Sequence, residues 1–199
     1  MVNIAMGMAF VLFLLPNNHL SQHNKINLIV LRHSERQDYA GNPDTKWPCD
    51  PNITNMGYEM AKRIKYFNGT LTRIMTSPFL RCRETARALN ENLHLPIYVD
   101  EMLFEHLVDP KVCRIRYHKL EFMGDHKLDD LKIRCSFLYW NIRKYENSMI
   151  VTHASIVKCL SELFLKKPLT GRYNVNYLEG FQIIEGNYRT IKSPFKKLI

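Results

Sequence analysis

The 199-residue chain lacks the motifs of several large protein classes. It has no zinc-finger spacing, no aromatic RNA-binding motif and no long run of lysine or arginine, so binding to nucleic acid is not indicated. None of its five cysteines stands in a Cys-x-x-Cys pair, and their odd number argues against a complete disulfide framework. Six histidines lie in polar stretches without the spacing of metal ligands: His19, His23, His94, His106, His118 and His126. We therefore expect free thiols in a reducing compartment, and neither a metal ion nor another cofactor.

A long transmembrane segment is also missing. The longest apolar run, residues 1–15, ends at Pro16 and is shorter than the about 20 residues that a membrane-spanning helix needs. It is similar to the apolar region of a signal peptide, but no lysine or arginine precedes it and no small-x-small cleavage site follows. We expect no stable membrane span and a cytoplasmic protein, with entry into the secretory pathway through residues 1–15 as the alternative.

The residues that are present suit one globular domain with a full core. Apolar residues make up 46% of the chain and charged residues 24%, which is typical of this class. We assign residues 1–25 to an apolar N-terminal segment and linker, and residues 26–199 to a single domain. The formal net charge of +9 favours anionic ligands without choosing among them. The oligomeric state stays open, a homodimer included.

The segment from Asn27 to Arg36 carries the first indication of function. Its apolar run, residues 28–31, is typical of a strand buried on both faces of a sheet. Arg32, His33 and Arg36 follow this strand at its carboxyl end, where open α/β folds bind ligands. Arginine suits phosphate, and an imidazole can act as a nucleophile or base near neutral pH. The segment alone predicts either an anion site with a titratable nitrogen or a solvated charge cluster.

Strands and helices are predicted to alternate along the rest of the chain. Further strands are expected at residues 71–76, 95–99 and 148–152, and a hairpin at 181–184 and 188–191. Helices are expected from the N-cap Thr54 to residue 67, and at 79–93, 133–145 and 155–165. In the helix at 133–145, Phe137, Leu138 and Trp140 are predicted to face the core. The alternation is typical of an α/β domain.

Two of these elements carry further basic residues to the edge where His33 lies. Arg81 comes just after the strand at 71–76, and His153 directly follows the strand at 148–152. Because the carboxyl ends of parallel strands meet at one edge of a sheet, these side chains are expected to converge on His33. Such convergence is not expected of random surface charge, so it favours the anion site.

Four motifs, in this order, resemble the histidine phosphatase superfamily, which has the phosphoglycerate mutase-like fold. They are Leu31-Arg32-His33-Ser34-Glu35-Arg36, Thr54-Asn55-Met56-Gly57, Ser77-Pro78-Phe79-Leu80-Arg81-Cys82-Arg83-Glu84-Thr85-Ala86 and Val151-Thr152-His153-Ala154-Ser155. The resemblance implies a three-layer α/β sandwich with a mostly parallel central sheet. Within the superfamily, the chain is most similar to the ubiquitin-associated/SH3-domain tyrosine phosphatase and ecdysteroid-phosphate phosphatase group. The segments that carry this narrower resemblance are Arg32 to Asp38, Asp50 to Thr54, Ser77 to Cys82 and Leu103 to Glu105.

The resemblance implies a phosphoric monoester hydrolase that needs no metal and works through a phosphohistidine. His33 would be the nucleophile, because a neutral imidazole can attack phosphorus near neutral pH. Arg32, Arg36 and Arg81 would neutralise the phosphoryl oxygens, and His153 would add a donor. Losing one such contact typically costs about 3 kcal/mol of transition-state stabilisation. The substrate would be a phosphoprotein or a small phosphate ester.

Two details of the site stay open at this point. The resemblance makes Glu105 the general acid, with Glu101 as a nearby competitor, and either would need burial to raise its pKa. Ser34 stands where the family usually has glycine, which permits a close backbone approach. The serine is therefore expected either to lower activity or to narrow the pocket.

Other functions are kept as alternatives. A phosphoglycerate mutase-type phosphotransferase is one, but the Gln-Ser and Trp-Asn pattern that mutases have after the histidine is missing here. A second is a non-catalytic regulatory protein that binds phosphate, in which Ser34 marks a loss of turnover. Substitution of His33 would separate an enzyme from a binding protein, because only the enzyme has turnover to lose.

Overall fold

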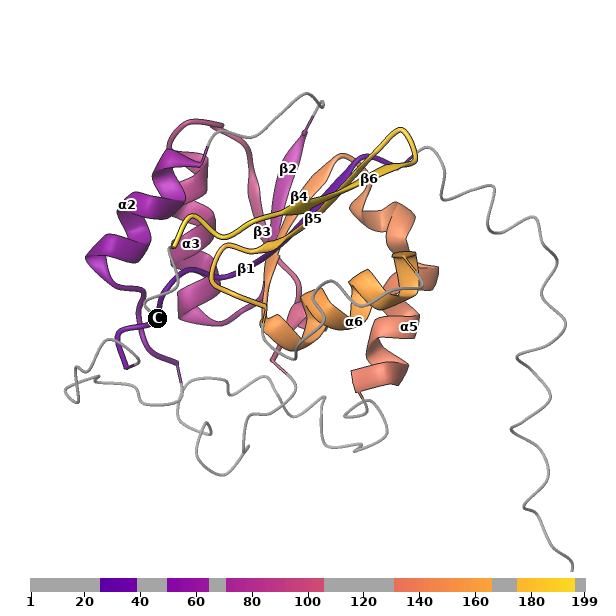
Figure 1. Cartoon of the computed structure of the whole chain (residues 1–199), viewed down its shortest axis with the longest axis horizontal. Helices are drawn as coiled ribbons and strands as arrows, with labels where there is room; N and C mark the ends of the chain where they lie inside the picture. Colours follow the sequence, from indigo (N-terminus) through magenta and orange to yellow (C-terminus); the bar gives the residue numbers. More distant parts are fainter. Residues whose placement is uncertain (1–25, 39–49, 65–70, 106–130, 166–174, 196–199) are drawn as a thin grey trace, which may run out of the picture.

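A six-stranded sheet forms the centre of the fold (Figure 1). The computed structural model describes residues 26–38, 50–64, 71–105, 131–165 and 175–195. The strands are β1 (Leu28–Arg32), β2 (Arg73–Thr76), β3 (Ile97–Val99), β4 (Ser148–Thr152), β5 (Gly180–Ile184) and β6 (Asn187–Ile191). Their order across the sheet is β3-β2-β4-β1-β5-β6. The first four strands are parallel, β5 is antiparallel to β1, and β6 is antiparallel to β5. The predicted, mostly parallel sheet is confirmed.

Helices cover both faces of this sheet, which makes a three-layer sandwich (Figure 1). The four α-helices in the described part are α2 (Asn55–Arg63), α3 (Leu80–Asn90), α5 (Leu131–Trp140) and α6 (Ala154–Leu165). Two short 3-10 turns, η2 (Glu101–Leu103) and η5 (Ile142–Tyr145), lie next to strands β3 and β4 in the chain. Helices α2 and α3 pack together on one face of the sheet, and α5 and α6 pack together on the other. The predicted α/β sandwich is therefore confirmed.

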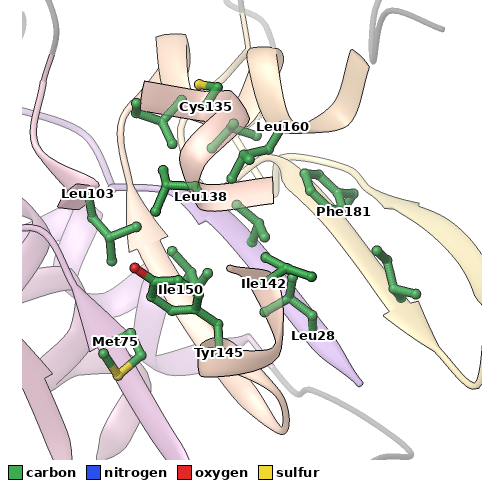
Figure 2. Close-up of a cluster of buried hydrophobic side chains, with 14 of the residues drawn as sticks. Leu28, Met75, Leu103, Cys135, Leu138, Ile142, Tyr145, Ile150, Leu160 and Phe181 are labelled. Carbon is green, nitrogen blue, oxygen red and sulfur yellow. The ribbon is translucent and has the colours of Figure 1, made fainter. Parts of the chain in front are cut away.

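The apolar run in β1 is buried from both sides, as its continuous pattern predicted. Leu28 and Val30 join the core cluster beneath α5 and α6 (Figure 2). Ile29 and Leu31 join the other cluster, beneath α2 and α3. All four side chains are almost completely inaccessible, and burying each contributes about 1.5–3 kcal/mol. Strand β1 is thus held firmly at the centre of the sheet, and the residues that follow it start from a fixed point.

Helices α2 and α3 begin where side-chain acceptors meet their first amides. The Oγ1 of Thr54 accepts a hydrogen bond from the Gly57 amide, so the predicted N-cap of α2 is confirmed. Helix α3 has no cap from its own N-cap residue Phe79, and Oδ1 of Asp50 accepts from the Leu80 amide at 2.7 Å instead. Helix α2 ends at Arg63, earlier than the predicted residue 67, and residues 65–70 lie outside the described part.

The predicted inner face of α5 is partly wrong. Leu138 is buried, but the side chains of Phe137 and Trp140 are 51% and 46% exposed. The helix instead turns Arg134, Cys135 and Leu138 inward. Apolar residues occur on nearly every side of this helix, so hydrophobicity alone did not define which stripe faces the core.

The terminal hairpin is confirmed and is built on a two-residue turn. Glu185 and Gly186 both have positive φ, 49° and 79°, which is the backbone of a turn that matches the twist of paired strands. At the start of β5, Gly180 lies against β1 so closely that a Cβ there would stand 1.9 Å from the Val30 carbonyl oxygen. Only glycine fits at that position.

Several predictions fall on segments outside the described residues. They are the assignment of residues 1–25 to an N-terminal segment, and the expectation that five histidines are not metal ligands: His19, His23, His106, His118 and His126. Within the described part, no helix is both long and apolar enough to cross a lipid bilayer.

Candidate active site

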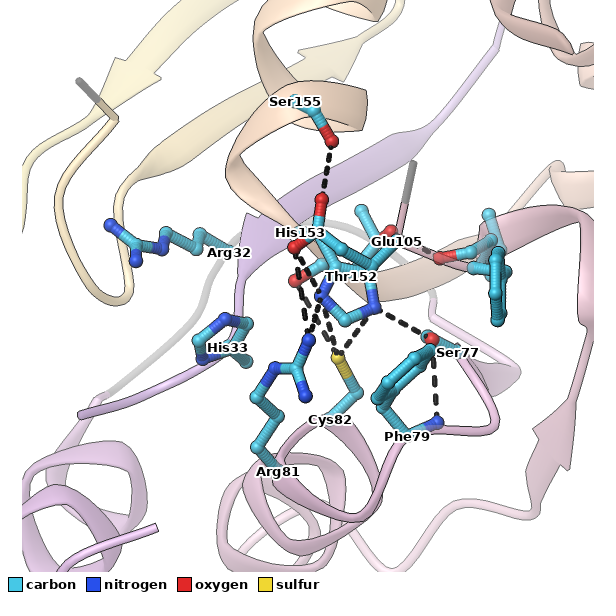
Figure 3. Close-up of polar contacts among 12 residues, drawn as sticks. Arg32, His33, Ser77, Phe79, Arg81, Cys82, Glu105, Thr152, His153 and Ser155 are labelled. Carbon is cyan, nitrogen blue, oxygen red and sulfur yellow. Dashed lines mark hydrogen bonds and ion pairs between the residues drawn. The ribbon is translucent and has the colours of Figure 1, made fainter. Parts of the chain in front are cut away.

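Three neighbouring strands end at the site, and each is followed by a polar side chain that enters it. In the sheet, Arg32 of β1 pairs with Thr152 of β4, and Thr76 of β2 pairs with Val151. The residues that come next continue the ladder: the His33 amide donates to Thr152 O at 2.8 Å, and the Ser77 amide to Val151 O at 3.0 Å. His153 follows β4 between them. The predicted convergence of strand ends is therefore found (Figure 3).

His33 presents one nitrogen without a proton. Its Nδ1 lies 2.7 Å from the backbone oxygen of Ser34, and a carbonyl oxygen can only accept, so Nδ1 carries the proton. Nε2 is then the unprotonated nitrogen. The side chain is 1% exposed, and burial together with the positive charges of Arg81 and Arg32 holds the pKa of His33 well below 6.5. The imidazole is therefore neutral, and able to attack, at physiological pH.

His153 lies edge-on to His33, with 5.5 Å between the ring centroids. Its Nδ1 is 3.1 Å from Oε2 of Glu105 and 3.3 Å from Nη2 of Arg81, and its Nε2 is 2.8 Å from Oγ of Ser77. Burial outweighs the attraction of Glu105 and lowers the pKa of His153 to about 4. His153 is therefore also neutral near pH 7.

Arg81 is almost completely buried beside these histidines. It is the second residue of α3, and its guanidinium stacks over the Phe79 ring with 4.3 Å from Cζ to the ring centroid. Nη1 lies 3.5 Å from Oδ1 of Asp50, and Nη2 lies 3.8 Å from Oε2 of Glu105. Asp50 also accepts from the first amide of α3, so one carboxylate fixes both the helix and its arginine. The result is a positive charge in a fixed place.

Glu105 is brought into the site by contacts along the preceding backbone. Thr152 Oγ1 donates to the Leu103 carbonyl at 2.7 Å, and Arg134 donates to the Phe104 carbonyl at 2.9 Å. Ser155, in the first turn of α6, donates to Oε1 of Glu105 at 2.8 Å. Glu101, the other candidate acid, is exposed in the turn η2. Of the two glutamates, only Glu105 contacts His153.

The protonation of Glu105 differs from the sequence-based expectation. Burial alone would raise the pKa of its carboxyl group, as predicted. The hydrogen bonds from His153 and Ser155 and the charge of Arg81 outweigh burial and lower the pKa of Glu105 to about 2. In the structure without a ligand, Glu105 is therefore a carboxylate.

The side chains of Arg32 and Arg36 contact residues different from those that contact Arg81. The Arg32 guanidinium donates from Nη1 to the Val175 carbonyl at 2.6 Å and stacks over the Tyr177 ring at 4.2 Å. Figure 3 shows this side chain extending away from the pair formed by Arg81 and His153. Arg36 forms an ion pair with Asp38, which is half-buried like Arg36 itself. Their assignment as phosphate ligands stays a prediction.

Hydrogen bonds hold Ser34 against helices α2 and α3. Its Oγ donates to the Gly57 carbonyl of α2 at 2.8 Å, and its amide donates to Oγ1 of Thr85 at 2.9 Å. The side chain is fully buried, and its φ is not positive. The backbone at this position therefore does not require glycine, and the hydroxyl is directed into the contact with α2.

Some residues of the site were missed in the sequence. Ser77 directly follows a predicted strand, as His33 and His153 do, and that position was a usable signal. Asp50 and Ser155 contact Arg81 and Glu105 only through the tertiary fold, so sequence spacing did not reveal them. His94 is exposed, in agreement with its place in a polar stretch of the sequence. Among the described residues, no group of three or more His, Cys, Asp or Glu side chains is placed to hold a metal ion.

The geometry combines a neutral nucleophilic nitrogen with a dense set of hydrogen-bond donors. His33 Nε2 has no proton, Arg81 is fixed beside it, and His153 and Glu105 lie next to Arg81. An anion of the size of a phosphoryl group would meet positive charge and a nucleophile in the same place. The arrangement can therefore bind a phosphate ester and attack its phosphorus atom.

Comparisons with known proteins show a partial match to one family model and a fold shared with several solved structures. Residues 28–110 match the family model of the histidine phosphatase superfamily (branch 1). YhfR from Bacillus stearothermophilus has a similar fold, with 24% identity, coverage of 82% of this chain and 94% of that chain, and a TM-score of 0.54. Phosphoserine phosphatase from Entamoeba histolytica is 16% identical, with coverage of 86% of this chain and 98% of that chain, and a TM-score of 0.57. Mycobacterial glucosyl-3-phosphoglycerate phosphatase is 18% identical, with coverage of 83% of this chain and 96% of that chain, and a TM-score of 0.52. No curated protein matches the chain.

These matches decide how far the resemblance in the sequence holds. The match of residues 28–110 to the family model supports the resemblance to the histidine phosphatase superfamily over that part of the chain, and the solved structures show a shared fold. They give no support to the narrower resemblance, to the ubiquitin-associated/SH3-domain and ecdysteroid-phosphate phosphatase group. At these identities the solved structures show a common fold, and the substrate has to be argued from the site.

Proposed function

We propose that the protein is a metal-independent phosphomonoesterase that forms a phosphohistidine on His33. The observation that carries this proposal is the hydrogen bond between Nδ1 of His33 and the Ser34 carbonyl. It leaves Nε2 unprotonated inside a positively charged site, and burial keeps the pKa of the ring low enough for this to hold at neutral pH. A nucleophile that is already neutral needs neither a general base nor a metal ion to activate it.

In the first step, Nε2 of His33 forms a bond to phosphorus while the bond from phosphorus to the ester oxygen breaks. The positive charges of Arg81 and Arg32 act on His33 and would balance the charge on the phosphoryl oxygens. His153 would donate a further hydrogen bond, and Glu105 would protonate the departing oxygen. In the second step, a water oxygen forms a bond to phosphorus while the bond from Nε2 to phosphorus breaks. Glu105, left as a carboxylate by the first step, would take the proton of the water, and inorganic phosphate and neutral His33 are released.

The substrate is a phosphoprotein or a small phosphate ester. Enzymes with this fold include phosphatases for phosphoserine and for glucosyl-3-phosphoglycerate, and a phosphoglycerate mutase from Bacillus anthracis. The sequence lacks the Gln-Ser and Trp-Asn pattern that mutases have after the histidine, which favours hydrolysis over transfer to a second substrate. Cytoplasmic location remains part of the same proposal.

The test is hydrolysis of p-nitrophenyl phosphate in the presence of EDTA, across pH 4 to 9. Wild type is compared with His33→Ala and with His94→Asn, which changes an exposed histidine outside the site. Asparagine suits the control because residue 94 has a φ of 53°. We expect activity in wild type and His94→Asn that EDTA does not remove, and none in His33→Ala.

Rapid acid-free quenching with a 32P-labelled ester adds a direct measurement. A base-stable, acid-labile label on wild type that is absent from His33→Ala would identify the phosphohistidine. Equal hydrolysis by wild type and His33→Ala would remove His33 as the nucleophile. If wild type shows no hydrolysis but binds phosphate, the phosphate-binding alternative would replace the enzyme.

A further inference from the structure

Ser77 contacts His153 on the opposite side of the ring from Glu105. Its Oγ lies 2.8 Å from Nε2 of His153, and both side chains are fully buried. The same Oγ accepts a hydrogen bond from the Phe79 amide at 3.4 Å (Figure 3). An oxygen that already accepts from an amide is well placed to donate its own proton to the ring nitrogen.

At the other ring nitrogen of His153, Glu105 and Arg81 compete, and both lie closer than the Cys82 sulfur at 3.9 Å. Glu105 can accept a proton from Nδ1, at 3.1 Å, whereas Arg81 can only donate toward Nδ1, at 3.3 Å. A protonated Nδ1 therefore satisfies Glu105, and an unprotonated Nδ1 satisfies Arg81. Because a neutral imidazole carries only one ring proton, the choice depends on what faces Nε2.

Two groups face Nε2, and they differ as donors. The thiol of Cys82 lies 3.5 Å from Nε2, but it also lies 3.6 Å from the Thr152 carbonyl, to which it donates its single proton. The Ser77 hydroxyl is closer and is the stronger donor of the two. Among the described residues, Ser77 is thus the group that keeps Nε2 as an acceptor.

We propose that Ser77 is a positioning residue that selects the tautomer of His153 protonated on Nδ1. This tautomer directs an N–H toward Glu105 and toward the place where the phosphoryl group would bind. Without Ser77, the ring would protonate Nε2, which then donates to Cys82, and Nδ1 would accept from Arg81. The consequence for turnover rests on the proposed phosphatase function, but the tautomer itself does not.

The experiment measures the tautomer by two-bond 1H–15N correlation NMR of the full chain with 15N-labelled histidine, at pH 7.5. The His153 signals are assigned by their loss in His153→Asn. In wild type we expect Nδ1 in the protonated range and Nε2 in the unprotonated range. In Ser77→Ala the two assignments should exchange, and in Ser77→Thr, which keeps a hydroxyl, they should return to those of wild type.

Cys82→Ala is the matched control, because it removes the other group beside Nε2. It should leave Nδ1 protonated. Wild-type His153 found protonated on Nε2 would overturn the proposal without any variant, so the test does not depend on Ser77→Ala folding. Nδ1 still protonated in folded Ser77→Ala would overturn it as well.

Activity supplies the second readout. Removing the partner that orients a catalytic imidazole typically costs about 10–100-fold in activity, so kcat/KM of Ser77→Ala should fall by that factor and recover in Ser77→Thr. A changed tautomer with unchanged kcat/KM would overturn the positioning role. If wild type hydrolyses no ester, the phosphatase proposal fails, while the NMR result still decides the tautomer.

Discussion

Glu105 is held as a carboxylate, although its proposed role requires a proton. Its three partners, His153, Ser155 and Arg81, all stabilise the negative charge. A bound phosphate dianion would compete for His153 and Arg81 and would place like charge beside the carboxylate, and both effects raise the pKa of Glu105. We infer that the substrate itself makes Glu105 an acid, by changing the environment that lowers its pKa to about 2 in the free site.

The first prediction concerns how Glu105→Gln acts on different leaving groups. An alkyl phosphate releases a strongly basic alkoxide that needs a proton, whereas p-nitrophenolate leaves readily without one. Glu105→Gln should therefore lower kcat/KM by about 10²–10⁴-fold for an alkyl ester, and much less for p-nitrophenyl phosphate. Steady-state kinetics on a series of aryl and alkyl phosphates measures this difference.

Glu101→Gln is the control for that series, because Glu101 is exposed four residues earlier. Its rates should match those of wild type for every ester. If Glu101→Gln shows the dependence on the leaving group instead, the acid is Glu101. An equal loss for all esters in Glu105→Gln would mean that Glu105 serves only to orient His153.

At the residue scale, the sequence reveals which side chains meet but not their protonation. His33 and His153 could be predicted because each lies two residues after an apolar run that is typical of a buried strand. The proton positions depend on Ser34 O, Ser77 and Glu105, and the last two reach His153 from distant segments of the chain. No local pattern encodes such contacts, so a pKa or a tautomer needs the fold.

At the scale of elements, the loop after β1 and the helix α2 fit together through Ser34 and Gly57. A Cβ on Gly57 would lie 2.9 Å from Oγ of Ser34, and 3.1 Å from the Glu35 carbonyl and from Oγ1 of Thr54. Ser34 Oγ cannot retreat freely, because it donates to the Gly57 carbonyl. The serine that departs from the family pattern is therefore matched to a glycine 23 residues later.

The second prediction tests that match. Gly57→Ala would favour an isolated helix by about 1 kcal/mol, but here overpacking should reverse the sign and lower the free energy of unfolding by about 1–3 kcal/mol. In the Ser34→Gly background the nearest contact is gone, so the same substitution should cost less. Urea unfolding of the two single variants and the double variant measures this coupling.

Met56→Ala is the control for this cycle, because Met56 lies in the same turn and its side chain is 58% exposed. Its effect should stay within about 0.5 kcal/mol in both backgrounds. An identical cost of Gly57→Ala with and without the Ser34 side chain would show that the two residues do not interact.

Helix α5 shows where element-scale prediction fails. Its position along the chain could be predicted, but of the three residues expected to face the core only Leu138 does. A strand buried on both faces needs no choice of face, so β1 was predicted correctly. In a helix with apolar residues on most sides, the sequence does not show which face is buried. For α5, contacts with the neighbouring helix α6 and with the sheet determine that face.

At the scale of the whole molecule, the order of strands is what assembles the site. Strand β4 lies between β1 and β2, so His153 stands between His33 and Ser77 although these residues are far apart in the chain. The α/β class followed from alternating elements, whereas this order depends on long-range pairing. Burying two histidines and a glutamate at one sheet edge also ties the stability of the whole domain to pH.

The last prediction is that the free energy of unfolding decreases as the pH falls below about 6.5. In the folded protein the pKa of His153 is about 4 and that of His33 is also lowered, from an ordinary value of 6.5. Between pH 6.5 and 4 the unfolded chain therefore binds protons that the folded chain does not, and acid favours unfolding. Glu105, with a pKa of about 2 against an ordinary 4.5, acts in the same direction below pH 4.5.

Urea unfolding at pH 7 and pH 5 separates His153 from the other titrating groups. His153→Asn should have a smaller loss of stability between the two pH values than wild type, because one of the two buried imidazoles no longer titrates. His94→Asn, which removes an exposed imidazole, should keep the wild-type loss. If His153→Asn and His94→Asn lose the same amount as wild type, His153 is not held neutral by burial, and the hydrogen bond from its Nδ1 to Glu105 would join two charged groups.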